Sequence, residues 1–253
     1  MFDIIRIPAF KDNYIWLLRK GASAVVVDPG DARPVREALE RDGLNLESIL
    51  ITHHHKDHQG GVAQLLENSS ARVFGPALES ITGRTQALRG GERISLSSLG
   101  AMLQVIAVPG HTLGHLAYYG HGCLFCGDTL FAGGCGRVFE GSYLQMHDSL
   151  MHLAGLPDET LIYCAHEYTE ANLRFALAVE PGNPALSRRN NEVAALRAKG
   201  LPTVPSTLGI EKATNPFLRC HVPEIRRAAQ ARGTLGGDEA AVFAAIREWK
   251  NDF

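Results

Sequence analysis

Short apolar runs alternate with amphipathic segments along the first two thirds of the chain. Closely spaced runs at 2–7, 14–19 and 24–28 are rich in β-branched and aromatic residues, which predicts neighbouring strands. Further strands are predicted at 48–51, 72–74, 102–108, 116–119, 122–126 and 161–164, and helices at 33–41, 60–67 and 142–153. This mixture predicts an α/β domain.

The pattern changes after residue 168. Four amphipathic segments follow at 170–180, 185–199, 223–232 and 238–250, separated by stretches rich in proline and glycine. No strong strand pattern remains there. The sequence therefore predicts an α/β domain at 1–168 and a helical domain at 169–253.

Composition excludes several classes of protein. The 253 residues carry 25 Lys and Arg against 27 Asp and Glu, a net charge of −2, so a nucleic-acid binder with its basic excess is not expected. No apolar run approaches the roughly 20 residues that span a bilayer, and no signal peptide is recognised. The five cysteines, an odd number without framework spacing, favour reduced thiols and a cytoplasmic location.

A dense cluster of metal-binding residue types follows the strand at 48–51. His53, His55 and Asp57 alternate, so in an extended segment they would share one side, and His58 would point elsewhere as the chain turns into a helix. By the same alternation His54 points away. Imidazole and carboxylate groups are favoured ligands of divalent transition metals. The cluster therefore predicts a metal site rather than a solvated polar loop.

Three more candidate ligands stand at the ends of other apolar strands: His111, Asp128 and His166. Together with the cluster they make five imidazoles and two carboxylates. That is too many ligands for one tetrahedral ion and suitable for two, with a carboxylate such as Asp128 able to bridge. His115 could orient a ligand, and the pair Cys123 and Cys126 is interpreted as packing.

These motifs resemble the metallo-β-lactamase superfamily, and further segments resemble its glyoxalase II (hydroxyacylglutathione hydrolase) branch over essentially the whole chain. The superfamily pattern is Thr-His-x-His-x-Asp-His from Thr52, then Gly110-His111-Thr112, Gly127-Asp128 and His166. The branch pattern lies at 10–14, 133–141, 165–169, 180–183 and 214–219, and in Arg247-x-x-Lys250-x-x-Phe253.

The resemblance implies an αββα sandwich with two divalent metal ions, zinc first, with iron or manganese as alternatives. One ion would take His53, His55 and His111, and the other Asp57, His58 and His166, with Asp128 and a hydroxide bridging them. The implied reaction is hydrolysis of S-D-lactoylglutathione to D-lactate and glutathione. Metal binding lowers the pKa of water from 15.7 to about 7, so no serine or cysteine nucleophile is needed.

The same resemblance implies the substrate contacts. Arg137, Arg247 and Lys250 would bind the carboxylates of glutathione, and Tyr168 would donate a hydrogen bond to its backbone. Some relatives have Lys and Tyr where this chain has Arg137 and Phe139, so we expect glutathione binding with altered affinity. We expect a monomer with a small-molecule substrate and neither a nucleic-acid nor a membrane partner.

Four alternatives remain open at this point: a lactonase or another thioesterase of the superfamily, a mononuclear iron dioxygenase acting on glutathione persulfide, a nucleic-acid-processing hydrolase, and a non-catalytic metal-binding module. The last would be expected to close its metal coordination, whereas seven ligands around two ions leave room for solvent.

Overall fold

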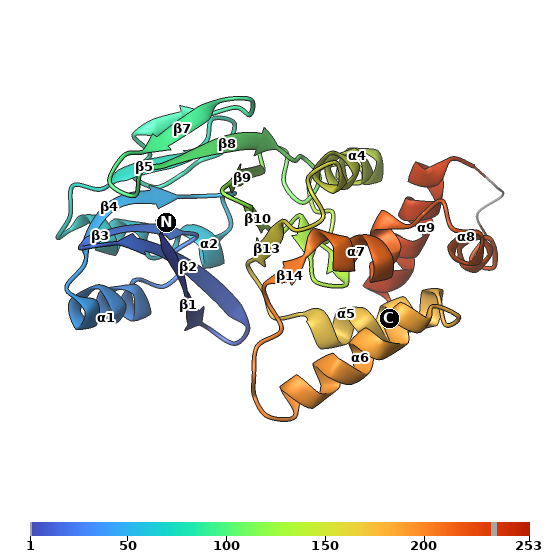
Figure 1. Ribbon diagram of the computed structural model, residues 1–253. Coiled ribbons are helices and arrows are strands. Elements are labelled where there is room, and N and C mark those ends of the chain that lie inside the picture. Colours follow the sequence, from blue (N-terminus) through green and yellow to red (C-terminus); the bar gives the residue numbers. More distant parts are fainter. Residues whose placement is uncertain (1, 234–236) are drawn as a thin grey trace. The chain divides into compact units, whose positions relative to one another are not determined.

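The computed structural model describes residues 2–233 and 237–253 (Figure 1). They form two compact units that interleave in sequence. The first comprises the chain up to Ala107 together with Gly114–Gly127, and the second comprises Val108–Leu113 with Asp128–Phe253.

The first unit is a β-sandwich with helices. One sheet has the order β1-β2-β3-β4-β5-β6, antiparallel among β1, β2 and β3 and parallel from β3 onward. The other contains the antiparallel series β10-β9-β8-β7. The strands are β1 (Asp3–Ala9), β2 (Asn13–Lys20), β3 (Ser23–Val27), β4 (Asn45–Leu50), β5 (Arg72–Pro76), β6 (Gln86–Leu88), β7 (Arg93–Leu96), β8 (Ala101–Ala107), β9 (Leu116–Gly120) and β10 (Cys123–Gly127), and the helices are α1 (Ala32–Asp42), α2 (Lys56–Gln59) and α3 (Val62–Leu66).

The apolar runs become central strands because both faces of the first sheet are covered. Ile15, Leu17 and Val26 pack with Val35 of α1 and Val62 of α3 in one core cluster. Side chains alternate along a strand, so the intervening residues face the other way. Tyr118 of β9 donates its hydroxyl to the carbonyl of Ile51 at 2.7 Å, which links the two sheets of this unit.

The second unit is mainly helical. Its helices are α4 (Tyr143–Ala154), α5 (Thr169–Val179), α6 (Pro184–Arg197), α7 (Leu208–Thr214), a 3-10 turn at Pro216–Leu218, α8 (Pro223–Gln230) and α9 (Glu239–Asn251), and its strands are β11 (Leu130–Phe131), β12 (Gly134–Cys135), β13 (Leu161–Cys164) and β14 (Ser206–Thr207). Helix α6 packs beside α5, and α4 beside α9 (Figure 1). The buried rings of Phe175, Phe217 and Phe243 join α5, the 3-10 turn and α9, with ring centroids 5.5–5.9 Å apart.

Local sequence signals fix several helix starts. Asp31 accepts a hydrogen bond from the backbone N–H of Arg33 at the start of α1, and Asn183 caps α6 just before Pro184. Ser142 and Gln145 form a capping box at the start of α4.

Two details of the predicted elements are wrong. The helix expected at 60–67 begins only at Val62, and an additional short helix, α2, precedes it, because the Gly60-Gly61 pair separates α2 from α3. A strand also exists after residue 168, since two-residue β14 pairs with β13, which lies before that boundary. Within residues 2–233 and 237–253, no helix combines the length and apolar character needed to cross a bilayer.

Candidate metal centre

The segment 52–58, called the metal loop here, follows β4 in the first unit. Residues 52–54 form a bend rather than a strand, and helix α2 already begins at Lys56. The expected extended alternation of His53, His55 and Asp57 is therefore wrong, since Asp57 and His58 lie in the first turn of a helix. The helix begins at Lys56, with His55 at its N-cap position.

The metal loop nevertheless brings its four candidate ligands together. Nε2 of His53 lies 3.0 Å from Nδ1 of His55, and Nε2 of His58 lies 3.5 Å from a carboxylate oxygen of Asp57. The His53 and His58 ring centroids are 4.0 Å apart, and both imidazoles are fully buried. The helical turn thus brings the four side chains close together, as alternation along a strand was expected to do.

Asp28 is the residue that orients this cluster, and it had no assigned role in the sequence. It is buried at the end of β3 with φ of 51°, a left-handed conformation that Asp tolerates better than most residues. Its carboxylate accepts hydrogen bonds from the Thr52 backbone N–H at 2.8 Å and the Thr52 hydroxyl at 2.7 Å, and lies 3.0 Å from Nδ1 of His58. The sequence signal that could have identified Asp28 is an acid placed between the end of an apolar strand and a Pro-Gly turn.

These contacts define which imidazole nitrogen carries the proton. A hydroxyl has one hydrogen, and Thr52 gives it to Asp28, so Nδ1 of His53, 3.1 Å away, must be the donor to the Thr52 oxygen. Nδ1 of His58 likewise donates to the carboxylate of Asp28. In the neutral form of both rings Nε2 then holds the lone pair, as a metal ligand requires.

Asn13 orients the carboxylate of Asp57, the candidate ligand of the metal loop that is not a histidine. Its side-chain amide donates to Asp57 at 3.0 Å, and Asn13 is itself buried at the start of β2. Ligating carboxylates are commonly held in this way by a second residue.

The second unit contains the other three candidate ligands around Asp128. One carboxylate oxygen of Asp128 lies 3.5 Å from Nε2 of His111, and the other lies 3.4 Å from Nε2 of His166. All three residues are buried. Nδ1 of His111 is 2.7 Å from the carbonyl oxygen of Arg137, which can only accept, so Nε2 of His111 again carries the lone pair.

These pairs fit a bound cation better than a hydrogen bond. At His58 with Asp57, and at His111 with Asp128, a nitrogen lone pair faces a carboxylate oxygen at 3.5 Å. If the imidazole were fully protonated, a charge-assisted hydrogen bond of about 2.7–2.9 Å would be expected. Acceptors that face each other, three of them buried and Asp57 partly exposed, favour a divalent ion between them, so the residues present are suited to hold one in each unit.

The chain after Asp128 returns close to it through a glycine-rich hairpin, β11–β12. A Cβ atom on Gly136 would lie 1.9 Å from the carbonyl oxygen of Asp128, so only glycine allows this approach. Side chains from three helical segments hold the hairpin backbone. Asn172 donates to the carbonyl of Ala132, Asn215 to the carbonyls of Phe131 and Gly134, Glu211 accepts from the N–H of Gly133, and Arg247 donates to the carbonyl of Cys135.

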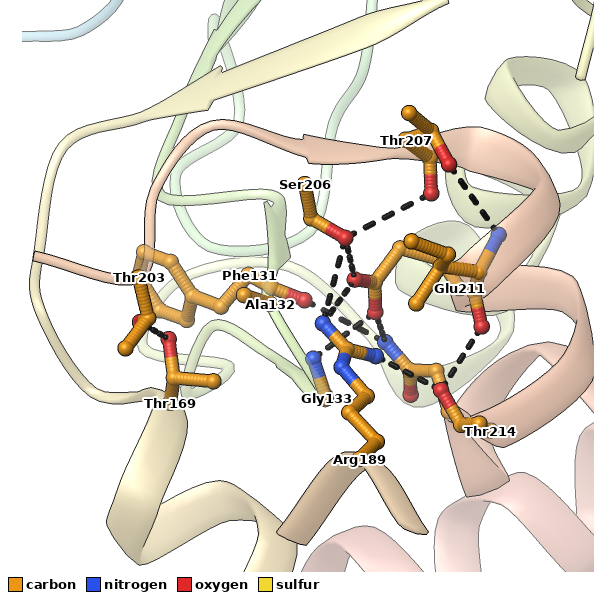
Figure 2. Close-up of polar contacts among 12 residues, drawn as sticks. Phe131, Ala132, Gly133, Thr169, Arg189, Thr203, Ser206, Thr207, Glu211 and Thr214 are labelled. Carbon is orange, nitrogen blue, oxygen red and sulfur yellow. Dashed lines mark hydrogen bonds and ion pairs between the residues drawn. The ribbon is translucent and has the colours of Figure 1, made fainter. Parts of the chain in front are cut away.

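Figure 2 shows the buried ion pair of Arg189 and Glu211, which contacts this hairpin at Gly133. The carboxylate of Glu211 accepts from Arg189 at 2.5 Å and from Ser206 at 2.5 Å, and Arg189 donates to Thr214 at 2.6 Å. The other oxygen of Glu211 accepts from Gly133 at 2.7 Å. This network ties the hairpin to α6, β14 and α7.

The expected substrate residues fall into two groups. Arg137, Phe139 and Tyr168 are partly or largely exposed. The Arg137 guanidinium lies 5.5 Å from the Phe139 ring centroid, Phe139 packs against His111 at 5.2 Å, and Tyr168 stacks on His166 at 4.7 Å. The exposed side chains therefore adjoin two of the candidate ligands.

Arg247 and Lys250 share one face of α9, as expected, because both lie over the ring of Phe217 at 5.3 and 5.7 Å. They face inward more than a surface pair would. Arg247 is 4% exposed and donates to the carbonyl of Cys135, and the Lys250 ammonium contacts the side-chain carbonyl of Asn172. Burial, and to a lesser extent the nearby Arg247 charge, lowers the pKa of Lys250 to about 7.

The cysteines behave as packing residues. All five lie in the described ranges, and all are buried free thiols. Burial raises the pKa of Cys135, an effect that the charges of Arg247 and Lys250 only partly offset. A thiol held in its protonated form is a poor nucleophile, which agrees with the interpretation of Cys135 as packing.

Comparison with known proteins identifies the family. Residues 10–166 match the family model described as metallo-β-lactamase superfamily, and residues 167–253 match hydroxyacylglutathione hydrolase C-terminus. Curated hydroxyacylglutathione hydrolases from Dechloromonas aromatica and Methylobacillus flagellatus are 60% and 54% identical, each over 100% of both chains. This chain belongs to the hydroxyacylglutathione hydrolase family. The resemblance inferred from the motifs is thereby confirmed.

Solved structures confirm the fold class. A crystal structure of ETHE1 from Myxococcus xanthus superposes with a TM-score of 0.67 at 24% identity, over 99% of this chain and 98% of that one. A di-iron-bound form of TTHA1623 superposes with a TM-score of 0.57 at 28% identity, over 81% of this chain and 95% of that one. This chain thus has the fold of the metallo-β-lactamase superfamily matched over residues 10–166, followed by a helical region.

Proposed function

We propose that this hydroxyacylglutathione hydrolase cleaves S-D-lactoylglutathione to D-lactate and glutathione, the second step of methylglyoxal detoxification. The support is the full-length identity of 54–60% to curated proteins of that name. The helical region that matches the hydroxyacylglutathione hydrolase C-terminus is the part that a lactonase or a metal-binding module would not need.

We propose that the seven candidate ligands form one binuclear centre. One ion would take His53, His55 and His111, the other Asp57, His58 and His166, with Asp128 shared. The observation that carries this proposal is the arrangement around Asp128, whose two oxygens each face a different imidazole at 3.4–3.5 Å. A carboxylate used by one ion alone has no need of imidazoles at both oxygens.

Divalent ions bound there would supply a water of lowered pKa and would polarise the thioester carbonyl. The protein's own residues then have simpler tasks. Asp28 and Thr52 hold a proton on Nδ1 of His58 and His53, so that Nε2 of each neutral ring is the atom available to a metal, and the carbonyl of Arg137 does the same for His111. In the overall reaction water adds to the carbonyl carbon, the C–S bond breaks, and the glutathione sulfur leaves as thiolate or thiol.

Zinc is the ion we propose, because imidazole and carboxylate ligands suit it. Iron and manganese remain to be tested by metal analysis, since these ligand types do not discriminate strongly among them. The di-iron form of TTHA1623 is one reason to include iron in that test.

For the substrate we propose two contact groups. Arg137, Phe139 and Tyr168 would contact the peptide portion, because their exposed side chains adjoin His111 and His166. Arg247 and Lys250 would attract a glutathione carboxylate. We further propose a metal-binding domain at 1–168, a substrate-binding domain at 169–253, and a monomer located in the cytoplasm.

A substrate panel tests the function. The purified protein should hydrolyse S-D-lactoylglutathione, followed by the loss of thioester absorbance in the ultraviolet, and should hydrolyse a lactone far more slowly. Oxygen consumption with glutathione persulfide should be absent. Faster turnover of the lactone, or oxygen uptake, would overturn the assignment.

A further inference from the structure

In the first unit, the loop 77–85 between β5 and β6 forms hydrogen bonds with the metal loop and with Gln59, which follows it. We call it the supporting loop. The carboxylate of Glu79, which is half-buried, accepts a hydrogen bond from the backbone N–H of His54 at 2.7 Å. Its other oxygen accepts from the backbone N–H of Gly114 at 2.9 Å. One acid therefore holds two separate segments by their backbone.

Gln59 completes this support on the other side of His54. Its amide nitrogen donates to the carbonyl of His54 at 2.6 Å and to the carbonyl of Ser80 at 3.0 Å, and its oxygen accepts from the N–H of Thr82 at 2.8 Å. The N–H of His54 belongs to the peptide that follows His53, and its carbonyl belongs to the peptide that precedes His55. Both peptide groups between the two candidate ligands are thus held by side chains.

The supporting loop is itself fixed. Arg84 donates to the backbone carbonyl of Glu79 at 2.7 Å and also to the carbonyl of Pro76. The backbone of Glu79 is therefore anchored to the end of β5 before its side chain reaches the metal loop.

The second segment held by Glu79 also bears on the ligands. Gly114 precedes His115, a fully buried residue whose ring stacks on that of His53 with centroids 4.6 Å apart and planes 18° apart. A Cβ atom on Gly114 would lie 2.6 Å from Cγ of Glu79. Glycine at this position is explained by the close approach of the carboxylate.

We propose that Glu79 is a positioning residue that sets the orientation of His53 and His55 for metal binding. The proposal rests on the proposed function in that it takes these two histidines as ligands. A carboxylate is suited to the task because charge-assisted hydrogen bonds are about twice as strong as neutral ones. Glu79 holds the peptide that follows His53, and Gln59 holds the peptide that precedes His55, which reduces the ordering that the loop must undergo when an ion binds. Glu79 is not one of the proposed ligands, and each of its oxygens accepts from a backbone N–H group.

The test is zinc affinity of the full chain carrying Glu79→Gln. An amide has one acceptor oxygen instead of two, so one of the two N–H contacts is lost. Chelator competition on metal-depleted protein should give a zinc affinity roughly 10–100-fold weaker than wild type. The thermal midpoint of the metal-depleted protein should change little, and kcat should fall while KM stays nearly constant. Glu67→Gln, which removes an exposed partner of Arg36, is the matched control and should bind zinc like wild type.

A structural role alone makes a different prediction: a lower thermal midpoint with unchanged zinc affinity, which would overturn the proposal. Cobalt(II) absorption provides a second readout, since it reports ligand geometry at the site. A spectrum identical to that of wild type in Glu79→Gln would also contradict the proposal.

Gly114→Ala offers an independent variant that keeps the carboxylate. Its methyl group should displace the Glu79 side chain and weaken zinc binding, whereas in a Glu79→Ala background the same change should have little further effect. Additive effects of the two changes would contradict the proposal. Failure of the wild type to hydrolyse S-D-lactoylglutathione would remove the proposed function, yet would leave the effect of Glu79 on zinc binding measurable in its own right.

Discussion

The metal loop of the first unit and the β11–β12 hairpin of the second use buried polar side chains for different purposes. Around the metal loop, Asp28 and Asn13 contact the side chains of candidate ligands and define their protonation and direction. Around the hairpin, Glu211, Asn215 and Asn172 contact backbone groups. The first arrangement orients side chains for metal binding, whereas the second stabilises the backbone conformation of the hairpin.

The difference leads to opposite expectations for mutation. A change beside the metal loop should weaken metal binding more than it weakens the fold. A change in the buried network of the hairpin should reduce the free energy of unfolding first.

The largest effect is expected at Glu211, which is fully buried. Glu211→Ala leaves Arg189 buried without its ion-pair partner and removes the acceptor of the Gly133 N–H. Breaking a buried pair in this way costs about 3–5 kcal/mol. Urea denaturation should show this loss in the free energy of unfolding.

An exposed pair gives the control for that measurement. Lys212 and Asp158 form an ion pair at 2.6 Å, with 36% and 70% of their side chains exposed. Asp158→Ala should cost less than about 1 kcal/mol. Equal losses in Glu211→Ala and Asp158→Ala would contradict the assignment of stability to the buried network.

On the other side of the comparison, Asp28→Asn should act on metal binding. One oxygen of Asp28 accepts from both the Thr52 hydroxyl and His58, and the other accepts from the Thr52 backbone N–H, so an amide group loses either the backbone contact or both side-chain contacts. We expect zinc affinity to fall roughly 10–100-fold, measured by chelator competition. Unchanged zinc affinity together with a large loss of unfolding free energy would show that Asp28 stabilises the fold, as the hairpin network does, and does not prepare the metal site.

The smallest effect is a pH dependence carried by Lys250. With a pKa lowered to about 7, Lys250 is charged below that pH and neutral above it. The nearby Arg247 charge favours the neutral form, and a Cys135 thiolate would favour the charged one. The charged fraction falls roughly tenfold between pH 6 and 8.

Attraction of a glutathione carboxylate should weaken accordingly, so KM for S-D-lactoylglutathione should rise up to about tenfold over this range. Lys250→Arg keeps its charge at all these pH values and should remove the rise. A rise of the same size in Lys250→Arg would assign the titration to another group.

The two regions also differ in how far the sequence could predict them. The metal loop combines four candidate ligands, three His and one Asp, in six residues after an apolar strand, so its chemistry is visible locally. The hairpin is different, because two-residue strands have too little periodicity to detect, and the side chains that hold it lie on helices 40 to 112 residues away in sequence. β14 was missed for the same reason.

Geometry within the metal loop was only partly predictable. Alternation along a strand was the expected route to convergence, whereas α2 begins at Lys56 and turns Asp57 and His58 inward. Asp28 stood out as an acid at a strand end, but its contact with His58 depends on the parallel pairing of β3 with β4. Glu79 offered no local signal at all, since its partners are backbone N–H groups of two distant segments.

The most direct test of the central claim is a metal titration of the depleted protein with activity followed in parallel. We predict that hydrolysis of S-D-lactoylglutathione reaches its maximum at two ions per chain, and that Asp128→Ala binds fewer ions and falls to background turnover. Full activity at one ion per chain, or an Asp128→Ala variant that retains wild-type turnover, would contradict the account.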